Sequence, residues 1–176
     1  FAGWLGFNAG SAGAANGLAA VAALTTIVAP AAAALGWLVV EWIQHRRPTL
    51  LGLLSGIVAG LVAVTPAAGF VDPKGAFIIG LIAGPICYLG SSWLKHRLKY
   101  DDSLDAWGIH GVGGVVGALL TGVFANAAIN GAAEGATILK QALGLVGVIA
   151  WSAIGTFAVL MICKFTTGLR VSKDQE

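Results

Sequence analysis

The stretch DAWGIHGVGG, residues 105–114, places one histidine in an apolar, glycine-rich run that meets no further charged residue before Glu134. The charge-free run Ala106–Ala133 is 28 residues long, and a helix needs about 20 apolar residues to cross a bilayer. We therefore expect a membrane-spanning helix here, with His110 inside it. Ionisable side chains in membrane helices are costly to bury and usually face the bundle interior or a cavity.

The composition of the whole chain is that of an integral membrane protein. Of its 176 residues, 57% are hydrophobic and 10% are charged, and the mean hydropathy is +0.86. Soluble domains carry about 25% charged residues, so this chain cannot supply a hydrated surface of ordinary size. The net charge of +2 is too small to indicate a nucleic-acid partner. Cys87 and Cys163 lie in apolar runs and are expected to be inert, buried thiols.

Charge-free segments with short polar connections predict an all-α membrane fold with five spans. The expected ranges are about 18–42, 49–68, 75–96, 103–123 and 138–165. Residues 1–10 are expected to end a preceding helix, polar residues from Asn8 to Asn16 to form a turn, and 166–176 to form a tail. Because the chain opens in an apolar stretch without Met or a signal peptide, we expect further sequence upstream.

Basic residues lie mainly on one side of these predicted spans. Eight of the ten Lys and Arg residues fall there, namely Arg46, Arg47, Lys95, Arg97, Lys99, Lys164, Arg170 and Lys173; Lys74 and Lys140 fall on the other side. Cytoplasmic loops carry the excess of Lys and Arg in membrane proteins. The pattern therefore predicts a multi-pass protein of the plasma (inner) membrane with a cytoplasmic C-terminus.

Small residues recur at the four-residue spacing that lets membrane helices approach closely. This spacing predicts a compact bundle with glycine at its helix contacts: Gly52, Gly56 and Gly60; Gly80 and Gly84; and Gly113 and Gly117.

The depth of His110 follows from the expected start of its helix near Asp102 or Ser103. Asp105 would lie in the first turn as a structural helix-start residue. About eight residues at 1.5 Å each then place His110 about 12 Å inside, near the middle of the membrane. Either a neutral ring bonded to a backbone carbonyl or a functional ring in a pathway fits this position.

No second central histidine or carboxylate accompanies His110 in the predicted spans. His45 and His96 lie in the basic clusters and are expected to be solvated. This arrangement does not favour haem ligation or a carboxylate proton relay. It favours passage of a small, mostly neutral solute along an apolar route.

Trp4 and Phe7 lie on one helix face near the predicted outer end, and Ser11 follows one turn later. One interpretation is an interfacial aromatic belt followed by turn residues. The other is an outer vestibule, in which ring faces and a hydroxyl oxygen attract a small cation.

Four motifs in this order resemble the ammonium transporter family (Amt/Mep/Rh), in its bacterial Amt branch. They are GWLGFNAGSA at 3–12, GLVAVTPAAG at 60–69, DAWGIHGVGG at 105–114 and TGLRV at 167–171. The resemblance covers the whole chain. It implies an eleven-helix inverted-repeat fold, of which this chain is the end of helix six plus transmembrane helices seven to eleven, assembled as a homotrimer with a pore in each subunit.

The resemblance also implies roles for individual residues. His110 matches the second of two histidines that face one another at the pore midplane. Phe7 matches one of two outer-gate phenylalanines, Ser11 the hydroxyl of the ammonium recruitment site, and Trp4 an aromatic beside it. Thr65 is a weaker, pore-lining match. The first histidine and the other gate aromatic would lie in the half that this chain lacks.

The implied function is an ammonium transporter rather than an enzyme, with no cofactor or metal. It would recruit NH4+ at the outer vestibule and pass NH3 with proton relay, in contact with the bilayer and with a cytoplasmic PII-type regulator. One alternative is an ammonium sensor, with the same fold joined to a signalling domain after Glu176. Two others are a Rh-like gas channel and a membrane bundle that serves packing alone.

Overall fold

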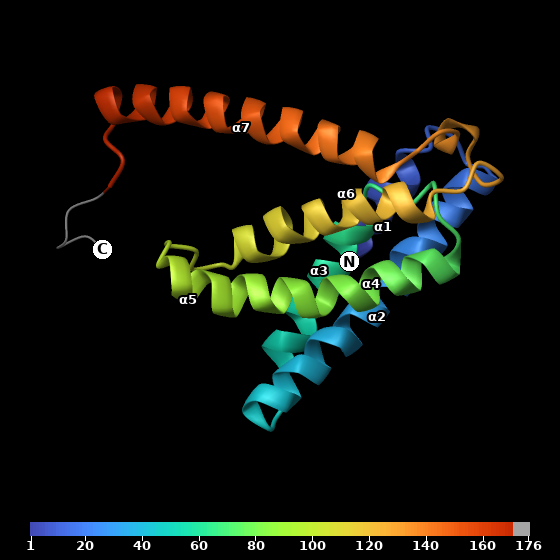
Figure 1. Ribbon diagram of the computed structural model, residues 1–176, viewed down its shortest axis with the longest axis horizontal. Helices are drawn as coiled ribbons and strands as arrows, with labels where there is room; N and C mark the ends of the chain where they lie inside the picture. Colours follow the sequence, from blue (N-terminus) through green and yellow to red (C-terminus); the bar gives the residue numbers. More distant parts are fainter. Residues whose placement is uncertain (171–176) are drawn as a thin grey trace. The chain divides into compact units, whose positions relative to one another are not determined.

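The computed structural model describes residues 1–170 and is all-helical over that range, which confirms the predicted fold class (Figure 1). Lys173 and the rest of the predicted tail lie outside the described residues. The elements are α1 (Ala2–Gly10), α2 (Gly17–His45), α3 (Leu50–Val64), α4 (Pro73–Leu89), the π-helical turn η1 (Gly90–Leu94), α5 (Lys95–Leu98), the π-helical turn η2 (Trp107–Gly111), α6 (Val112–Phe124), the 3-10 turn η3 (Gly131–Ala133) and α7 (Ile138–Thr166).

Within residues 1–170, four continuous helical stretches are long and apolar enough to cross a membrane. They overlap four of the five predicted spans and run over Gly17–His45, Pro73–Leu98, Trp107–Phe124 and Ile138–Thr166. The chain divides into two compact units, residues 1–141 and 142–176. The second unit contains most of α7, a 29-residue helix in which no residue is buried.

The expected span at 49–68 is shorter than predicted, because α3 ends at Val64 after 15 residues. A helix of this length extends about 22 Å, less than the roughly 30 Å of a hydrocarbon core. Pro66 explains the end, since proline lacks an N–H and disfavours α-helical backbone in the residue before it. The chain continues to Phe70 as successive turns, with Thr65 N–H donating to Val62 O at 3.2 Å.

Polar side chains begin the three helices that form the core of the first unit. Asn16, Thr49 and Asp72 each accept a hydrogen bond of 2.7–3.0 Å from the backbone N–H three residues later. The buried carboxylate of Glu41 also accepts bonds from the N–H and hydroxyl of Thr49, at 3.0 and 2.7 Å. These caps satisfy orphan N–H groups at the helix starts.

Glycines form the closest contacts between helices, which confirms the predicted tight packing. A Cβ atom at Gly80 of α4 would collide with the carbonyl oxygen of Ala29 of α2, and Gly84 repeats this contact one turn later. A Cβ atom at Gly117 of α6 would collide with the carbonyl oxygen of Ala63 of α3. Helix backbones therefore touch each other directly at these positions.

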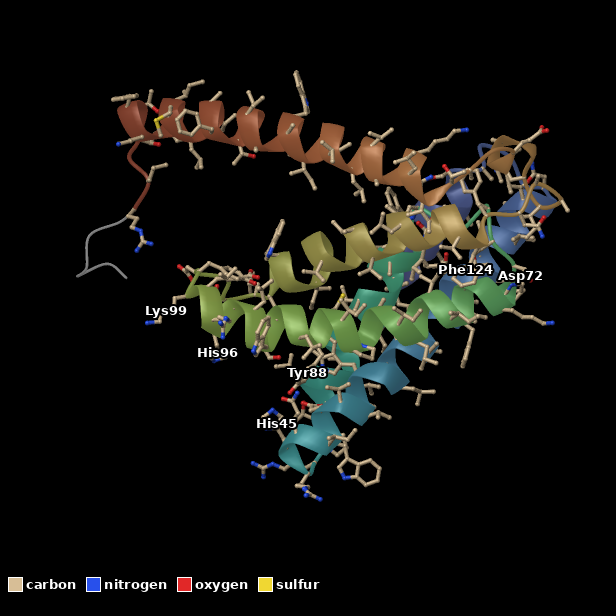
Figure 2. The ribbon with its side chains drawn as sticks, in the orientation of Figure 1. His45, Asp72, Tyr88, His96, Lys99 and Phe124 are labelled. Carbon is tan, nitrogen blue, oxygen red and sulfur yellow. The ribbon has the colours of Figure 1, made fainter. Side chains whose placement is uncertain are left out.

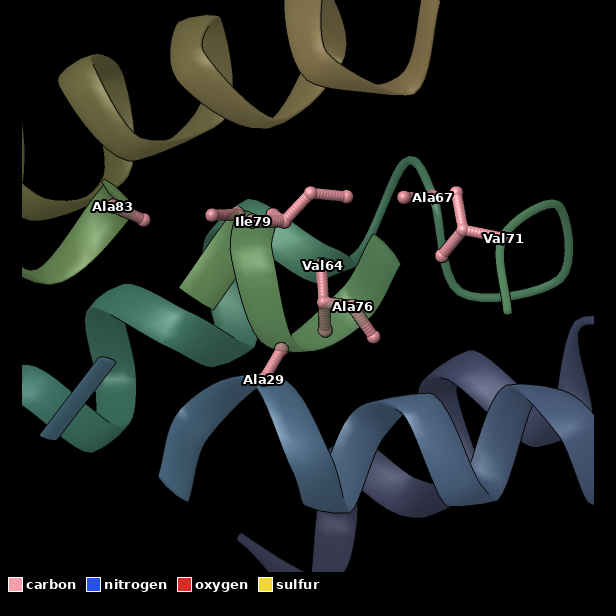
Figure 3. Close-up of a cluster of buried hydrophobic side chains, with 8 residues drawn as sticks. Ala29, Val64, Ala67, Val71, Ala76, Ile79 and Ala83 are labelled. Carbon is pink, nitrogen blue, oxygen red and sulfur yellow. The ribbon is translucent and has the colours of Figure 1, made fainter. Parts of the chain in front are cut away.

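A cluster of small buried side chains surrounds these contacts (Figure 3). Its members come from α2, α3, α4 and the turns after α3, and they are Ala29, Ala63, Val64, Ala67, Val71, Ala76, Ile79 and Ala83. Alanine dominates because helices this close leave no room for larger side chains.

The two ends of the first unit carry different side chains. His45, His96 and Lys99 lie toward one end, and Asp72 and Phe124 lie together at the other (Figure 2). The end with Lys99 is the one that the charge pattern predicts to be cytoplasmic.

Replacing Gly80 with alanine tests the backbone contact between α2 and α4. The added methyl group would push the two helices apart, and overpacking of this kind costs about 1–3 kcal/mol. We expect Gly80→Ala to lower the Tm of the purified full-length protein, measured by its thermal unfolding in detergent. Gly155→Ala is the control, because nothing lies within 4 Å of a Cβ atom there. Equal Tm values for both variants would contradict the packing assignment.

Candidate functional site

Three of the residues predicted from the sequence meet at one place, although they come from distant segments. Trp4 lies on α1, Thr65 follows α3, and His110 lies in the π-helical turn η2. The Trp4 indole N–H donates to Thr65 Oγ1 at 2.8 Å. The Trp4 ring stacks on the His110 imidazole, with centroids 6.2 Å apart and planes inclined by 18°. The Thr65 bond and the stack together fix the indole beside the imidazole.

Thr65 is itself held by the helix that precedes it. Its hydroxyl donates to Leu61 O at 2.7 Å while accepting from the Trp4 indole. The hydroxyl hydrogen is therefore committed, and the contact with Trp4 has a defined direction. Side chain to backbone bonds of this kind are common where Ser or Thr lies in an apolar helix.

The turn that carries His110 is started by Asp102. Its two carboxylate oxygens accept bonds from the backbone N–H groups of residues 106, 107 and 108, at 2.8, 2.9 and 3.3 Å. A carboxylate at a helix N-terminus satisfies orphan donors and interacts favourably with the helix dipole. Asp102 therefore sets where the helix of His110 begins.

Asp105 lies at the start of the helix, as predicted, and its backbone carbonyl accepts the bond from the Ile109 N–H at 2.9 Å, but its side chain does not cap the helix. It lies directly before the helix with left-handed backbone (φ 53°), a conformation that Asp tolerates better than most residues. Its carboxylate pairs with Lys95 at 2.9 Å instead of capping the helix. The cap comes from Asp102 instead, whose carboxylate accepts from three N–H groups.

The helix of His110 thus begins about four residues later than predicted, so helix length alone no longer sets the depth of the ring. Packing supplies the depth instead. The Cys87 thiol lies 3.7 Å from Ile109 O, and Cys87 is close to the middle of the 26-residue helical stretch Pro73–Leu98. His110 therefore lies level with the middle of that stretch.

The glycines near His110 serve mainly in helix contacts. A Cβ atom at Gly108 would press on Ser91 of η1, and one at Gly113 would lie 3.1 Å from the Cys87 sulfur. Gly114 alone of these faces open space. The His110 side chain is exposed in this chain, so close packing surrounds its backbone and leaves its ring accessible.

A pocket of about 190 Å³ lies at the end of the first unit where α1 meets α2. Of the candidate site residues named from the sequence, Phe7, Ser11 and Thr65 line this pocket and Trp4 does not. Its full lining is Phe7, Asn8, Ser11, Ala12, Leu18, Ala22, Thr65, Ala68, Gly69, Phe70 and Asn130. None of these residues carries a charge at neutral pH, so the pocket can attract a cation only through oxygen dipoles and ring faces.

The hydroxyl of Ser11 is oriented to accept. It donates its hydrogen to Phe7 O at 2.6 Å, which leaves the oxygen lone pairs free for a donor in the pocket. The Phe7 ring is 60% exposed, so its face is available to a ligand as well.

Asn8 is the lining residue that sequence reasoning assigned wrongly, since it lies within α1 and is buried instead of forming a turn. Its amide N–H donates to Thr26 Oγ1 at 3.0 Å, and that hydroxyl donates to Ala22 O at 2.6 Å. A carbonyl can only accept, so this chain of bonds fixes the amide with its NH2 group toward Thr26. The Asn8 carbonyl oxygen is left as a further acceptor. Asn8 lies three residues before Ser11, on the same helix face, and this spacing in the sequence could have indicated that both line one pocket.

Asp102 can be tested against its sequence neighbour. We expect Asp102→Ala to destabilise the protein by about 0.5–2 kcal/mol, because the variant leaves N–H groups at the start of the His110 helix without a partner. Asp101→Ala removes the same charge from an exposed neighbour and should leave the Tm unchanged. Thermal unfolding of both purified variants measures the difference, and similar losses in the two would remove the capping role from Asp102.

Comparison with known proteins relates the sequence of this chain to one family. The sequence profile of the Ammonium Transporter Family matches residues 1–176. An ammonium transporter of Aquifex aeolicus is 48% identical over 179 residues, which cover 99% of this chain and 42% of the relative. The chain therefore spans less than half the length of this curated relative.

Solved structures agree with the sequence relatives. The crystal structure of Saccharomyces cerevisiae Mep2 superposes with a TM-score of 0.88 at 38% identity, covering 98% of this chain and 41% of that one. A structure described as Sensor Amt Protein superposes with a TM-score of 0.88 at 32% identity, covering 98% of this chain and 44% of that one.

Proposed function

Because the chain belongs to the ammonium transporter family, a family of transporters and not of enzymes, we propose that it forms part of a membrane pore for ammonium. The observation that carries this proposal is the meeting of Trp4, Thr65 and His110 from three distant segments. Ammonium would enter from the pocket that Phe7 and Ser11 line and continue as ammonia past His110.

Recruitment in the pocket uses the chemistry of the ammonium ion itself. The ion has four N–H donors and one positive charge, so it needs oxygen acceptors and negative electrostatic potential. The lone pairs of Ser11 and Asn8 supply the acceptors, and the Phe7 ring face supplies the potential. A pocket without a formal negative charge binds such a cation weakly enough to release it inward.

Deprotonation removes the main barrier to crossing the apolar interior. A bare cation would lose its hydration there at a large cost in free energy, whereas neutral ammonia loses little. NH4+ gives one proton and one NH3 molecule, and the two recombine on the far side. An imidazole can take part because one ring nitrogen donates while the other accepts, and the Trp4 stack keeps the His110 ring in one orientation.

The matched relatives are more than twice as long as this chain, and the remaining pore residues would come from the rest of that length. We expect a second pore histidine and a second gate aromatic there. The exposed His110 ring supports this arrangement, since it is open to a neighbour.

The location and partners follow the same reasoning. The end of the first unit with His96 and Lys99 would face the cytoplasm, in a plasma (inner) membrane protein with its C-terminus inside. A homotrimer and a PII-type regulator remain predictions from the family, and most of the tail that would dock the regulator lies outside the described residues.

A sensor is the second candidate, and the likeness to the Sensor Amt Protein favours it. The same pocket and histidine would then report ammonium to a signalling domain. Purified full-length protein in liposomes separates the two, because a transporter moves ammonium without any signalling domain and a sensor of this kind binds it with little or no flux.

Replacing His110 tests the proton relay. We expect His110→Ala to abolish the ammonium-evoked current of liposomes adsorbed to a solid-supported membrane, because charge movement depends on a ring that can pass a proton. The matched control is His96→Ala, which removes a histidine from α5, away from the contacts of Trp4, Thr65 and His110, and should leave the current unchanged. Unchanged current in His110→Ala would exclude the proposed role.

Replacing Ser11 tests recruitment at the pocket. Loss of one acceptor for a charged donor should raise the half-saturating ammonium concentration by about three- to tenfold, which corresponds to about 1 kcal/mol. Ser92→Ala is the matched control, because its hydroxyl makes the same 2.6 Å bond to a backbone carbonyl four residues earlier at the other end. Equal half-saturating concentrations in the two variants would contradict a role for the Ser11 oxygen in the pocket.

A further inference from the structure

A second cleft, of about 540 Å³, lies at the opposite end of the first unit from the ammonium pocket. Its lining residues lie at the ends of α2 and α4, and the ribbons of these two helices diverge toward those ends (Figure 1). Its lining comes from the ends of both helices and from η1 and α5, and consists of Gln44, His45, Tyr88, Leu89, Ser92, Trp93, His96 and Arg97. Nothing in the proposed pore uses these residues.

Tyr88 lines this cleft and is hydrogen-bonded to two of its polar side chains, those of Gln44 and His45. Its ring packs edge-on against Trp37 with centroids 5.4 Å apart, and it is nearly buried. Its hydroxyl donates to Gln44 Oε1 at 3.1 Å, so the 2.9 Å contact with His45 Nε2 has that nitrogen as donor. The other nitrogen of His45 is left free.

His96 faces the same cleft from the other helix (Figure 2). Its Nδ1 lies 2.6 Å from Ser92 O. Because a carbonyl only accepts, Nδ1 carries the hydrogen, and Nε2 presents a lone pair that can accept from a ligand's donor. Two imidazoles from two helices therefore border one opening, each anchored through one nitrogen.

Arg97 supplies a permanent positive charge beside these rings. Its guanidinium carbon lies 5.6 Å above the Trp93 ring, a cation–π contact that holds the group at the mouth of the cleft. No Asp or Glu is among the lining residues. The carboxylate of Glu41 accepts bonds from Thr49 and is not among the lining residues, so the lining itself carries the positive charge of Arg97 and no carboxylate.

Apolar side chains continue from this cleft toward the body of the helices. Ile43 of α2 is 71% exposed, and Leu89 of α4 and Trp93 are 44% and 59% exposed. Trp at such a level is typical of the membrane interface. A cationic side chain and exposed apolar side chains thus lie next to each other, which suits an amphipathic ligand better than a small free anion.

We propose that this cleft binds the headgroup phosphate of an anionic phospholipid, with an acyl chain along the apolar surface of α2 and α4. Arg97 would bind the phosphate, since guanidinium groups recognise phosphate oxygens in forked geometry, and the lone pair on His96 Nε2 would accept from a headgroup hydroxyl. Basic pockets between membrane helices on the cytoplasmic side bind anionic headgroups in this way. A zwitterionic lipid finds no carboxylate here for its quaternary ammonium group.

Native mass spectrometry of the purified full-length protein in detergent tests this site with two lipids of equal chains, palmitoyl-oleoyl phosphatidylglycerol and phosphatidylcholine. We expect tighter binding of the phosphatidylglycerol. Arg97→Gln should weaken it about fivefold, the effect of about 1 kcal/mol per basic side chain, and Arg97→Gln with His96→Gln should weaken it further. Lys74→Gln removes an exposed charge from the opposite end and should change the affinity less than twofold.

Additional measurements distinguish a lipid phosphate from free inorganic phosphate as the ligand. An excess of inorganic phosphate should not displace the phosphatidylglycerol, because it lacks the acyl chain. Displacement by inorganic phosphate, equal binding of the two lipids, or equal effects of Arg97→Gln and Lys74→Gln would each overturn the proposal. Arg97→Lys keeps the charge and should retain most of the binding, and an unchanged Tm of Arg97→Gln shows that its loss of binding is not a loss of folding.

Discussion

Direct contact between helix backbones is the constraint on which the rest of this structure depends. Lipid tails are as apolar as leucine, so membrane helices gain little from the hydrophobic effect against each other and associate through close packing. Gly80 and Gly84 bring α4 onto the carbonyl oxygens of α2, and Gly117 brings α6 onto α3. These contacts set the level of Cys87 beside Ile109, and with it the level of His110.

The candidate site is assembled from these fixed helices by a small number of polar contacts. One indole N–H bond and one aromatic stack join α1, the end of α3 and η2 around Trp4. The end of α3 can supply Thr65 because the helix stops before Pro66 and turns. Asp102 holds the start of the helix that presents His110. The ring itself stays exposed, as a residue that acts on a passing solute requires.

The two ends of the first unit differ in the charge and polarity of their openings. The pocket near Ser11 and Asn8 is polar but uncharged, and it suits brief binding of a small cation. The cleft near His96 and Arg97 is cationic and continues into apolar surface, and it suits a lasting contact with an anionic lipid. Both lie away from the backbone contacts of Gly80, Gly84 and Gly117, which leave no space for a ligand.

The sequence by itself determined the all-helical membrane fold and the glycine contacts, and it drew attention to His110, because hydropathy, four-residue spacing and one histidine in an apolar run are properties of local sequence. It could not determine that α3 stops at Val64, that Asp102 caps the helix in place of Asp105, or that Asn8 is buried. Each of these depends on which group lies nearest in space across a loop or between helices. Only the tertiary structure decided that Trp4 bonds Thr65 and stacks on His110. These two partners lie 61 and 106 positions after Trp4 in the chain, and helix packing alone makes them its neighbours.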